Sequence, residues 1–243
     1  MSIIKLDAID STNDFLKELA RNQSLENFTA VVTRAQHRGR GQMGTQWVSE
    51  PDKNLIMSVL LKDFPLKIED VFVLNALVSV AVIEAIHSLE IPNLSVKWPN
   101  DIMSESKKIG GILVENSLKT DTTITSVIGL GLNVNQLQFH QLPHASSLRI
   151  QSGKEFEIDD VMLQVLGQIK LLYRLILEGM YDDLWERYHN HLFRKGIPSV
   201  FEDVSKKRFM GIIERVNPQG KLEVRLENDT LASYFLKEIQ MIY

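Results

Sequence analysis

The spacing of hydrophobic residues changes several times along this chain, and each change predicts a different kind of element. Apolar residues that recur every three or four positions predict helices at residues 12–22, 70–90, 158–178 and 181–193. Short apolar runs bounded by glycine, proline or polar residues predict strands near residues 3–7, 28–34, 54–62, 94–98, 109–117 and 122–134. Because the helices are bunched and do not alternate strictly with the strands, we expect an α+β fold, a mixed sheet with helices mainly on one face.

The hydrophobic pattern takes a different form after Gly196. Residues 221–227 alternate strictly between polar and apolar side chains, as a half-buried strand does. Turn signals lie on both sides of this segment, at residues 217–220 and 227–229. We therefore predict two domains, residues 1–195 and a small C-terminal β-barrel at residues 196–243.

Composition limits the class of protein. The chain has 243 residues, of which 44% are hydrophobic, enough for one medium domain with a real core and a small second domain. It contains no cysteine, so disulfides, cysteine-ligated zinc and a cysteine nucleophile are excluded. The formal net charge of −4 argues against a dedicated nucleic-acid binder, because neutralising phosphates requires a basic surface.

No segment predicts secretion or insertion into a membrane. Charged side chains interrupt the apolar residues near the N-terminus, unlike those of a signal peptide. These are Lys5, Asp7 and Asp10. The longest apolar run, residues 71–86, contains Asn75, Ser79 and Glu84, so it predicts a buried helix and falls short of a membrane span. We expect a soluble cytoplasmic protein with no membrane partner.

A loop at residues 34–47 carries arginines between glycines. The glycines, Gly39, Gly41 and Gly44, allow the backbone to come close to a ligand. The guanidinium groups of Arg38 and Arg40 can bind a phosphate or carboxylate in a bidentate way. Taken alone, the loop predicts an anion site no more strongly than a solvated basic turn or a nucleic-acid contact.

Further polar residues follow the apolar strand at residues 94–96. Pro99 restricts the backbone there, so polar side chains project from the strand end beside a rigid corner. These are Lys97, Asn100 and Asp101. Lys107 and Lys108 head the next strand, whose apolar residues predict that at least one ammonium lies at the mouth of a buried strand. The alternative is a pair of solvated lysines.

Two more segments carry a signal. Ser11 or Thr12 is predicted to cap the N-terminus of a helix with one apolar face. Taken alone, this pattern indicates only an ordinary capped helix. Residues 127–135 combine apolar residues and glycines that lead to Asn133. Glycine in a buried strand indicates that another backbone or a ligand comes close.

These four segments, in this order, resemble the biotin protein ligase family. That family shows an STN turn, a QxxGRGxxG loop ending in tryptophan, a KWPND turn, a KxxGILVE strand and a GxGxNV strand. The corresponding positions here are residues 11–13, 36–44 with Trp47, 97–101, 108–115 and 129–134. The resemblance spans roughly the first 135 residues, and the C-terminal fifth is similar as well.

The resemblance implies a catalytic domain related to class II aminoacyl-tRNA synthetases, followed by an SH3-like domain. It implies a ligase that uses ATP and Mg²⁺ to activate biotin as biotinyl-5′-AMP. The acceptor would be a lysine of a biotin carboxyl carrier protein, from acetyl-CoA carboxylase or another biotin-dependent carboxylase, and the enzyme a monomer or homodimer. Because the first helix begins near residue 12, we expect the monofunctional type, without an N-terminal DNA-binding domain or a DNA partner.

The implied reaction brings two anions together, since the carboxylate of biotin must attack the α-phosphate of ATP. We assign Arg40 and Lys108 to these anions, and Asp101 either to Mg²⁺ or to orienting the acceptor amine. Lys97 is a further candidate phosphate contact. The expected biotin site comprises Ser11, Thr12, Asn13, Gln36, Gly39, Arg40, Gly41, Gln42, Lys108 and Gly111. The expected nucleotide site comprises Lys97, Trp98, Asn100 and Asn133.

Gln42 departs from the most familiar family pattern, in which many members carry a second arginine. An amide keeps hydrogen-bonding capacity and loses a charge, which bears on how firmly the loop retains the adenylate. Two other functions stay open at this point. One is a lipoate-type protein ligase, and the other is a non-catalytic module that binds biotin or RNA.

Overall fold

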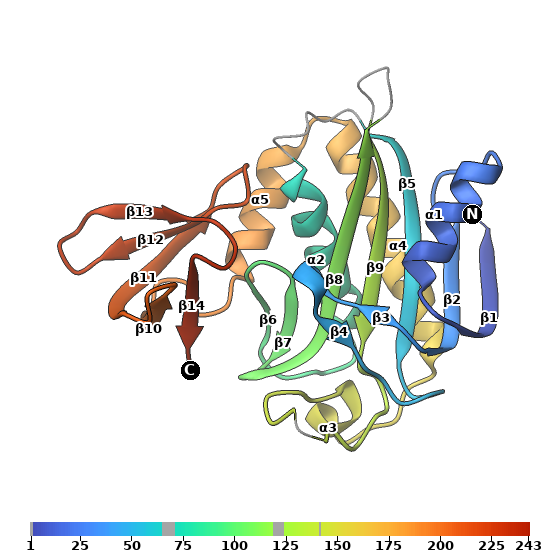
Figure 1. Ribbon diagram of the computed structural model, residues 1–243, viewed down its shortest axis with the longest axis horizontal. Helices are drawn as coiled ribbons and strands as arrows, with labels where there is room; N and C mark the ends of the chain where they lie inside the picture. The colour runs from blue at the N-terminus through green and yellow to red at the C-terminus, as the bar shows by residue number, and fades with distance from the viewer. Residues whose placement is uncertain (1, 65–70, 119–123, 141) are drawn as a thin grey trace.

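Seven strands form the main sheet, which is mixed as predicted. The computed structural model describes residues 2–64, 71–118, 124–140 and 142–243. The strands are β1 (Ile3–Ile9), β2 (Ala30–Gln36), β5 (Leu55–Phe64), β6 (Leu94–Lys97), β7 (Asp101–Ser104), β8 (Lys107–Leu118) and β9 (Ile124–Leu132). Their order is β1-β2-β5-β9-β8-β7-β6 (Figure 1). β1 and β2 are parallel, and the other neighbouring pairs are antiparallel.

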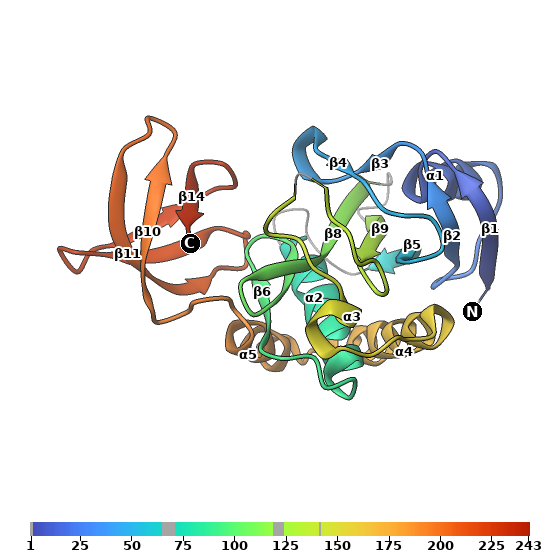
Figure 2. The same cartoon turned by 90° about the horizontal axis from the view of Figure 1, so that it is seen from below.

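Helices cover mainly one face of this sheet. Figure 2 shows α2 (Phe72–His87), α4 (Ile158–Leu177) and α5 (Tyr181–Asn190) below the strands, with α1 (Thr12–Asn22) on the other side. α2 is apolar around its whole circumference because it lies between the sheet and the outer helices, and it forms the centre of the largest core cluster. α1 packs through Leu16 on a separate small cluster of Val31, Leu60 and Val127. The two faces of the sheet therefore have different environments, a core below and a single helix above.

Several short elements were not predicted. β7 lies in a stretch that we expected to be a turn, and α3 (Leu148–Ser152), β3 (Gly39–Arg40) and β4 (Gln46–Trp47) lie where no element was expected. The helix expected to reach residue 193 ends at Asn190, and Asn133 follows the end of β9. Residues 70, 122 and 123 of the predicted elements lie outside the described residues. Contacts with neighbouring segments, more than local propensity, form such short elements.

The C-terminal residues form a second, antiparallel sheet. Its strands are β10 (Pro198–Asp203), β11 (Arg208–Val216), β12 (Leu222–Leu226), β13 (Leu231–Tyr234) and β14 (Ile239–Ile242), in the order β13-β12-β11-β10-β14 (Figure 1). The predicted small β-barrel has the form of an open five-stranded sheet, since β13 and β14 stand at opposite ends of the sheet and are not paired in the described chain. Each has only four residues, so few backbone groups are available to close the sheet.

The two sheets meet at a tight junction. Nε1 of Trp98 donates a hydrogen bond to the carbonyl oxygen of Gly220 at 2.9 Å. Gly220 has a φ of +80°, and a Cβ atom on it would lie 2.5 Å from Cδ2 of Phe72. Buried residues of both parts belong to one hydrophobic cluster. The domain boundary predicted at residue 196 falls between α5 and β10, and it stays a prediction because packing is continuous across it.

We predict that Gly220→Ala lowers the free energy of unfolding more than Gly196→Ala does. Both glycines have a positive φ, which costs another residue about 1 kcal/mol. Only at residue 220 would the added methyl group also collide with a ring. Urea unfolding of the two variants, followed by circular dichroism, measures the difference. Equal losses would show that the junction does not depend on this contact.

Candidate active site

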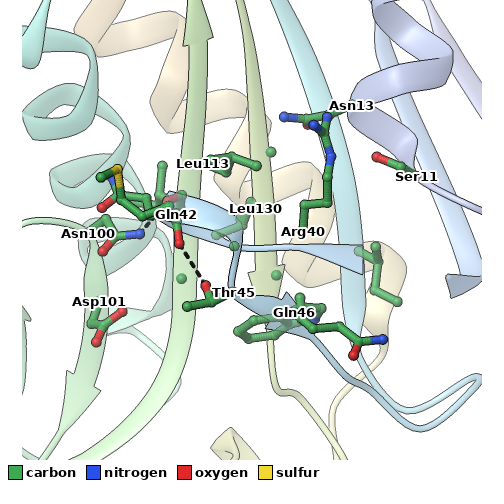
Figure 3. Close-up of a pocket in the computed structure, with 18 of the residues that line it drawn as sticks. Ser11, Asn13, Arg40, Gln42, Thr45, Gln46, Asn100, Asp101, Leu113 and Leu130 are labelled. Atoms are coloured by element: carbon green, nitrogen blue, oxygen red, sulfur yellow. Dashed lines mark hydrogen bonds between the residues drawn. The ribbon is translucent and has the colours of Figure 1, made fainter. Parts of the chain in front are cut away.

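A cavity of about 270 Å³ is lined by the start of α1, so it lies on the face of the main sheet that carries this helix. Segments far apart in the sequence form its walls, and Figure 3 shows Ser11 and Asn13 on one side, Asn100 and Asp101 on the other, and Arg40 between them. The structure brings together most of the predicted site residues. Those that line the cavity are Ser11, Thr12, Asn13, Gln36, Arg40, Gly41, Gln42, Asn100, Asp101, Lys108 and Gly111.

The first turn of α1 supplies uncharged hydrogen-bonding groups. The hydroxyl oxygen of Ser11 caps the helix by accepting a backbone N–H at 3.3 Å. Gln36 accepts the backbone N–H of Thr12 through Oε1 at 2.9 Å. Oγ of Ser58, on β5, lies 2.7 Å from Oγ1 of Thr12 and 2.5 Å from Oδ1 of Asn13. Because most of these side chains are buried and hydrogen-bonded to one another, their positions are set before a ligand binds.

Four charged side chains form a cluster next to these groups. Nη2 of Arg40 lies 2.6 Å from Asp14 and 3.1 Å from Glu115. Nζ of Lys17 lies 2.9 Å from each of the same two carboxylates. Two cations thus match two carboxylates, and Arg40, which we predicted to bind an anion, is already paired within the chain.

The pKa of Glu115 lies below its usual range. Burial on its own would raise the pKa, but hydrogen bonds from Lys17 and Asn13, together with the charges of Lys17 and Arg40, outweigh burial. The pKa of Asp14 is lowered in the same way, by Lys17 and Arg40 against the effect of burial. Both carboxylates are therefore ionised in the neutral range, which keeps the cluster intact.

A second ion pair lies on the other side of the cavity. Nζ of Lys108 is 2.6 Å from Oδ1 of Asp101, across the paired strands β7 and β8. The backbone of Lys108 is held on both sides, since its N–H donates to the carbonyl of His144 at 2.7 Å and its carbonyl accepts from Ser146 at 2.9 Å. The side chain is 37% exposed, so the ammonium faces both Asp101 and the open cavity. One ammonium thus lies at the start of a buried strand.

The glycines of β8 and β9 make room for two side chains from the N-terminal part of the chain. Gly111 and Gly131 are paired in register. A Cβ atom on Gly131 would lie 2.4 Å from Cε2 of Trp47, and one on Gly129 would lie 2.5 Å from Oδ1 of Asn13. The close approach that the glycines indicated is therefore made by an indole and an amide, and the indole becomes a wall of the cavity.

Four predicted site residues lie outside the cavity lining that the described residues form. Gly39 is paired with β4 in the hairpin that carries the indole. Asn133 is buried and donates from Nδ2 to a backbone carbonyl at 2.9 Å. Lys97 and Trp98 line a second cavity of about 370 Å³. That cavity adjoins the first, because both are lined by Pro99, Leu236 and Lys237.

Several residues of the site were not predicted from the sequence. Glu115 lies four positions after Gly111 on β8. Because side chains of a strand alternate between its two faces, this spacing could have placed Glu115 on the same face as Gly111, which lines the cavity. Ser58 is a buried polar residue in an otherwise apolar stretch of strand, a signal of similar strength. Leu236 and Lys237 come from the second sheet, and nothing local in the sequence connects them with the cavity.

Comparison with known proteins places the chain in a family. Residues 6–133, more than half of the 243, match the biotin/lipoate A/B protein ligase family. The chain belongs to this family. The bifunctional ligase/repressor BirA of Bacillus spizizenii is 34% identical over 195 residues, which are 76% of this chain and 59% of that protein. The biotin–[acetyl-CoA-carboxylase] ligase of Mycobacterium tuberculosis is 30% identical over 150 residues, 59% of this chain and 54% of that one. This chain thus spans less than two thirds of these relatives.

Solved structures of family members share the whole architecture. The biotin protein ligase from Aquifex aeolicus, in complex with biotin and ATP, matches with a TM-score of 0.82 at 26% identity. The match covers 99% of this chain and 98% of the other, so it includes both sheets. The predicted α+β fold is confirmed. No helix in the described part of the chain is long and apolar enough to cross a membrane.

We predict that Glu115→Gln makes the fold less sensitive to acid. Because folding lowers its pKa, Glu115 stabilises the fold above its usual value of 4.5, and this contribution disappears as the pH falls through the lower folded value. The melting temperature of the unmodified chain should therefore fall further between pH 7 and pH 3 than that of the variant. Glu227→Gln, which removes an exposed carboxylate, is the control. A parallel decline in all three proteins would refute the role given to Glu115.

Proposed function

We propose that this chain is an ATP-dependent biotin–protein ligase, which activates biotin as biotinyl-5′-AMP and transfers it to a lysine of a biotin carboxyl carrier protein. The observation that carries the proposal is one cavity with two chemically different sides. One side offers fixed, uncharged donors and acceptors, and the other offers the ion pair of Lys108 and Asp101. The ligases among the relatives, and the neighbour that holds biotin and ATP, support the same substrates.

The uncharged side suits the ureido ring of biotin. A ureido group has two N–H donors and one carbonyl acceptor, which Ser11, Thr12 and Gln36 can match. The indole of Trp47 offers an apolar surface for the fused rings. Ser58 and Gly131 act indirectly, since the first holds Thr12 and the second leaves space for the indole.

The charged side suits adenylation. An oxygen of the biotin carboxylate attacks the α-phosphorus of ATP, the bond from that phosphorus to the bridging oxygen breaks, and pyrophosphate leaves. Lys108 supplies a positive charge where the two anions meet, which is electrostatic stabilisation of the transition state. Arg40 bonds the carboxylates of its cluster through Nη2, and a guanidinium has five N–H donors, so others are available to an anion.

The donor set of the cavity fits an Mg²⁺ ion that arrives with the phosphates. Mg²⁺ takes one or two carboxylates and completes its shell with water and phosphate oxygens. Asp101 is the carboxylate in the described lining, and no group of three or more metal-binding side chains gathers elsewhere in the described chain. When bound, the ion would neutralise phosphate charge. In the transfer step, the neutral amine of the acceptor lysine attacks the carbonyl carbon of the adenylate, and AMP leaves.

The nucleotide site that we propose extends along the shared wall of the two cavities. Asn100 lines the first cavity, and Lys97 and Trp98 line the second. Asn133 is better explained as a structural residue, because its amide bonds a backbone carbonyl away from both cavities. We also propose a cytoplasmic enzyme without a DNA partner, which agrees with a chain that has no cysteine and a net charge of −4.

The central test is pyrophosphate release that requires both biotin and ATP. We predict that Lys108→Ala slows this release by about a hundredfold or more, because it removes a charge partner of the transition state. Lys107→Ala is the matched control, since that ammonium bonds the carbonyl of Pro143 at 2.7 Å. Release that depends on lipoate in place of biotin would assign the chain to the lipoate ligases. Near-normal release by Lys108→Ala would remove Lys108 from the mechanism.

The role of Asp101 has its own test. We predict that Asp101→Asn raises the Mg²⁺ concentration needed for half-maximal pyrophosphate release, because an amide is a weaker ligand than a carboxylate. Transfer from preformed biotinyl-5′-AMP to a carrier protein should be much less affected. If transfer alone fails, Asp101 orients the acceptor amine and does not bind the ion.

A further inference from the structure

Helix α4 carries an exposed stripe on the side that faces away from the core. Its buried residues pack on α2 and β5. Exposed residues recur every three or four positions on the opposite side, so they form one stripe along the helix. They are Asp160, Leu163, Gly167, Leu171 and Arg174. Leu163 and Leu171 are 50% and 49% exposed, so the stripe presents two large apolar side chains to its outside.

Gly167, at the centre of the stripe, does not pack against any described part of the chain. Among the described residues, a Cβ atom on it would meet nothing within 4 Å. Glycine inside a helix costs about 1 kcal/mol relative to alanine. An exposed helical position that could hold alanine, and instead holds glycine, leaves space for a second backbone to approach closely.

The other residues of the stripe are symmetric about Gly167. Leu163 and Leu171 each lie four positions away, and Asp160 and Arg174 each lie seven positions away. In an antiparallel pair of helices with a two-fold axis at Gly167, residues equidistant from it stand at the same height along the axis. Leu163 would then lie beside the second copy's Leu171, and Asp160 beside the second copy's Arg174.

We propose that α4 is a self-association surface, occupied by α4 of a second copy of this chain in antiparallel orientation. Charge decides the orientation, since antiparallel packing forms an ion pair at each end of the contact, whereas parallel packing in the same register sets like charges against each other. One helix pair buries less area than a standard interface, so we expect a weak, reversible dimer with a Kd on the order of 100 μM. Figure 2 shows α4 and α1 on opposite sides of the main sheet. Because the start of α1 lines the cavity, pairing through α4 leaves the cavity of each copy uncovered.

The absence of cysteine makes disulfide mapping a sharp test. We expect oxidation of Gly167→Cys to give a cross-linked dimer, because this residue faces itself across the axis. Leu163→Cys and Leu171→Cys should cross-link with each other when the two variants are mixed, and neither should cross-link alone. Leu177→Cys, which is 53% exposed on the same helix but far from the axis, is the control for random collisions. Equal cross-linking of the Gly167 and Leu177 variants would overturn the proposal.

A charge swap tests the same contact in solution. Asp160→Arg and Arg174→Asp should each raise the dimer Kd about tenfold, because each replaces two ion pairs by repulsion. The double variant should restore the original Kd, as measured by sedimentation equilibrium of the full chain. The proposal fails if the double variant is as weak as the single ones, or if the unmodified chain stays monomeric up to about ten times the expected Kd.

Discussion

The site depends on the glycines along the middle of β8 and β9, which leave the backbone there without side chains. Gly111 pairs with Gly131, and Gly129 lies two positions before Gly131 on the same face of β9. The opposite face of these strands carries large apolar residues that pack in the core with α2. Because the upper face has no side chains at these glycines, Trp47 and Asn13 can lie directly against the backbone there. The hairpin and the first turn of α1 are thereby brought to one place, and the cavity is the space left between them.

Three cationic side chains at the site are paired before a ligand arrives. Arg40 and Lys17 share Asp14 and Glu115, while Lys108 holds Asp101. An entering anion therefore meets cations that already have a negative partner, and it binds through their remaining N–H donors or in place of that partner. Pairing also avoids an isolated charge in a partly buried place, which would be costly. The same arrangement means that changing one acid also changes what its cation binds.

The sequence predicted those parts of the protein that local patterns encode. The helix after Ser11, the apolar helix α2 and the alternation in the second sheet follow from spacing and capping. β7 and α3 escaped because four- and five-residue elements depend on pairing or caps more than on propensity. At the site, the glycines indicated a close approach, but no local signal could tell that Trp47 would make it. Lys97 projects from the predicted strand end but lines the neighbouring cavity, since the second sheet stands beside it.

Leu236 and Lys237, from the connection between β13 and β14, complete a wall that Ser11 and Gln36 begin. Chains fold largely from the N-terminus as they leave the ribosome. A nascent chain can therefore assemble its main sheet while one side of the cavity is still missing. The wall exists only once β14 has paired with β10, because that pairing fixes the connection beside the cavity. During synthesis the pocket is thus completed later than the main sheet that forms its floor.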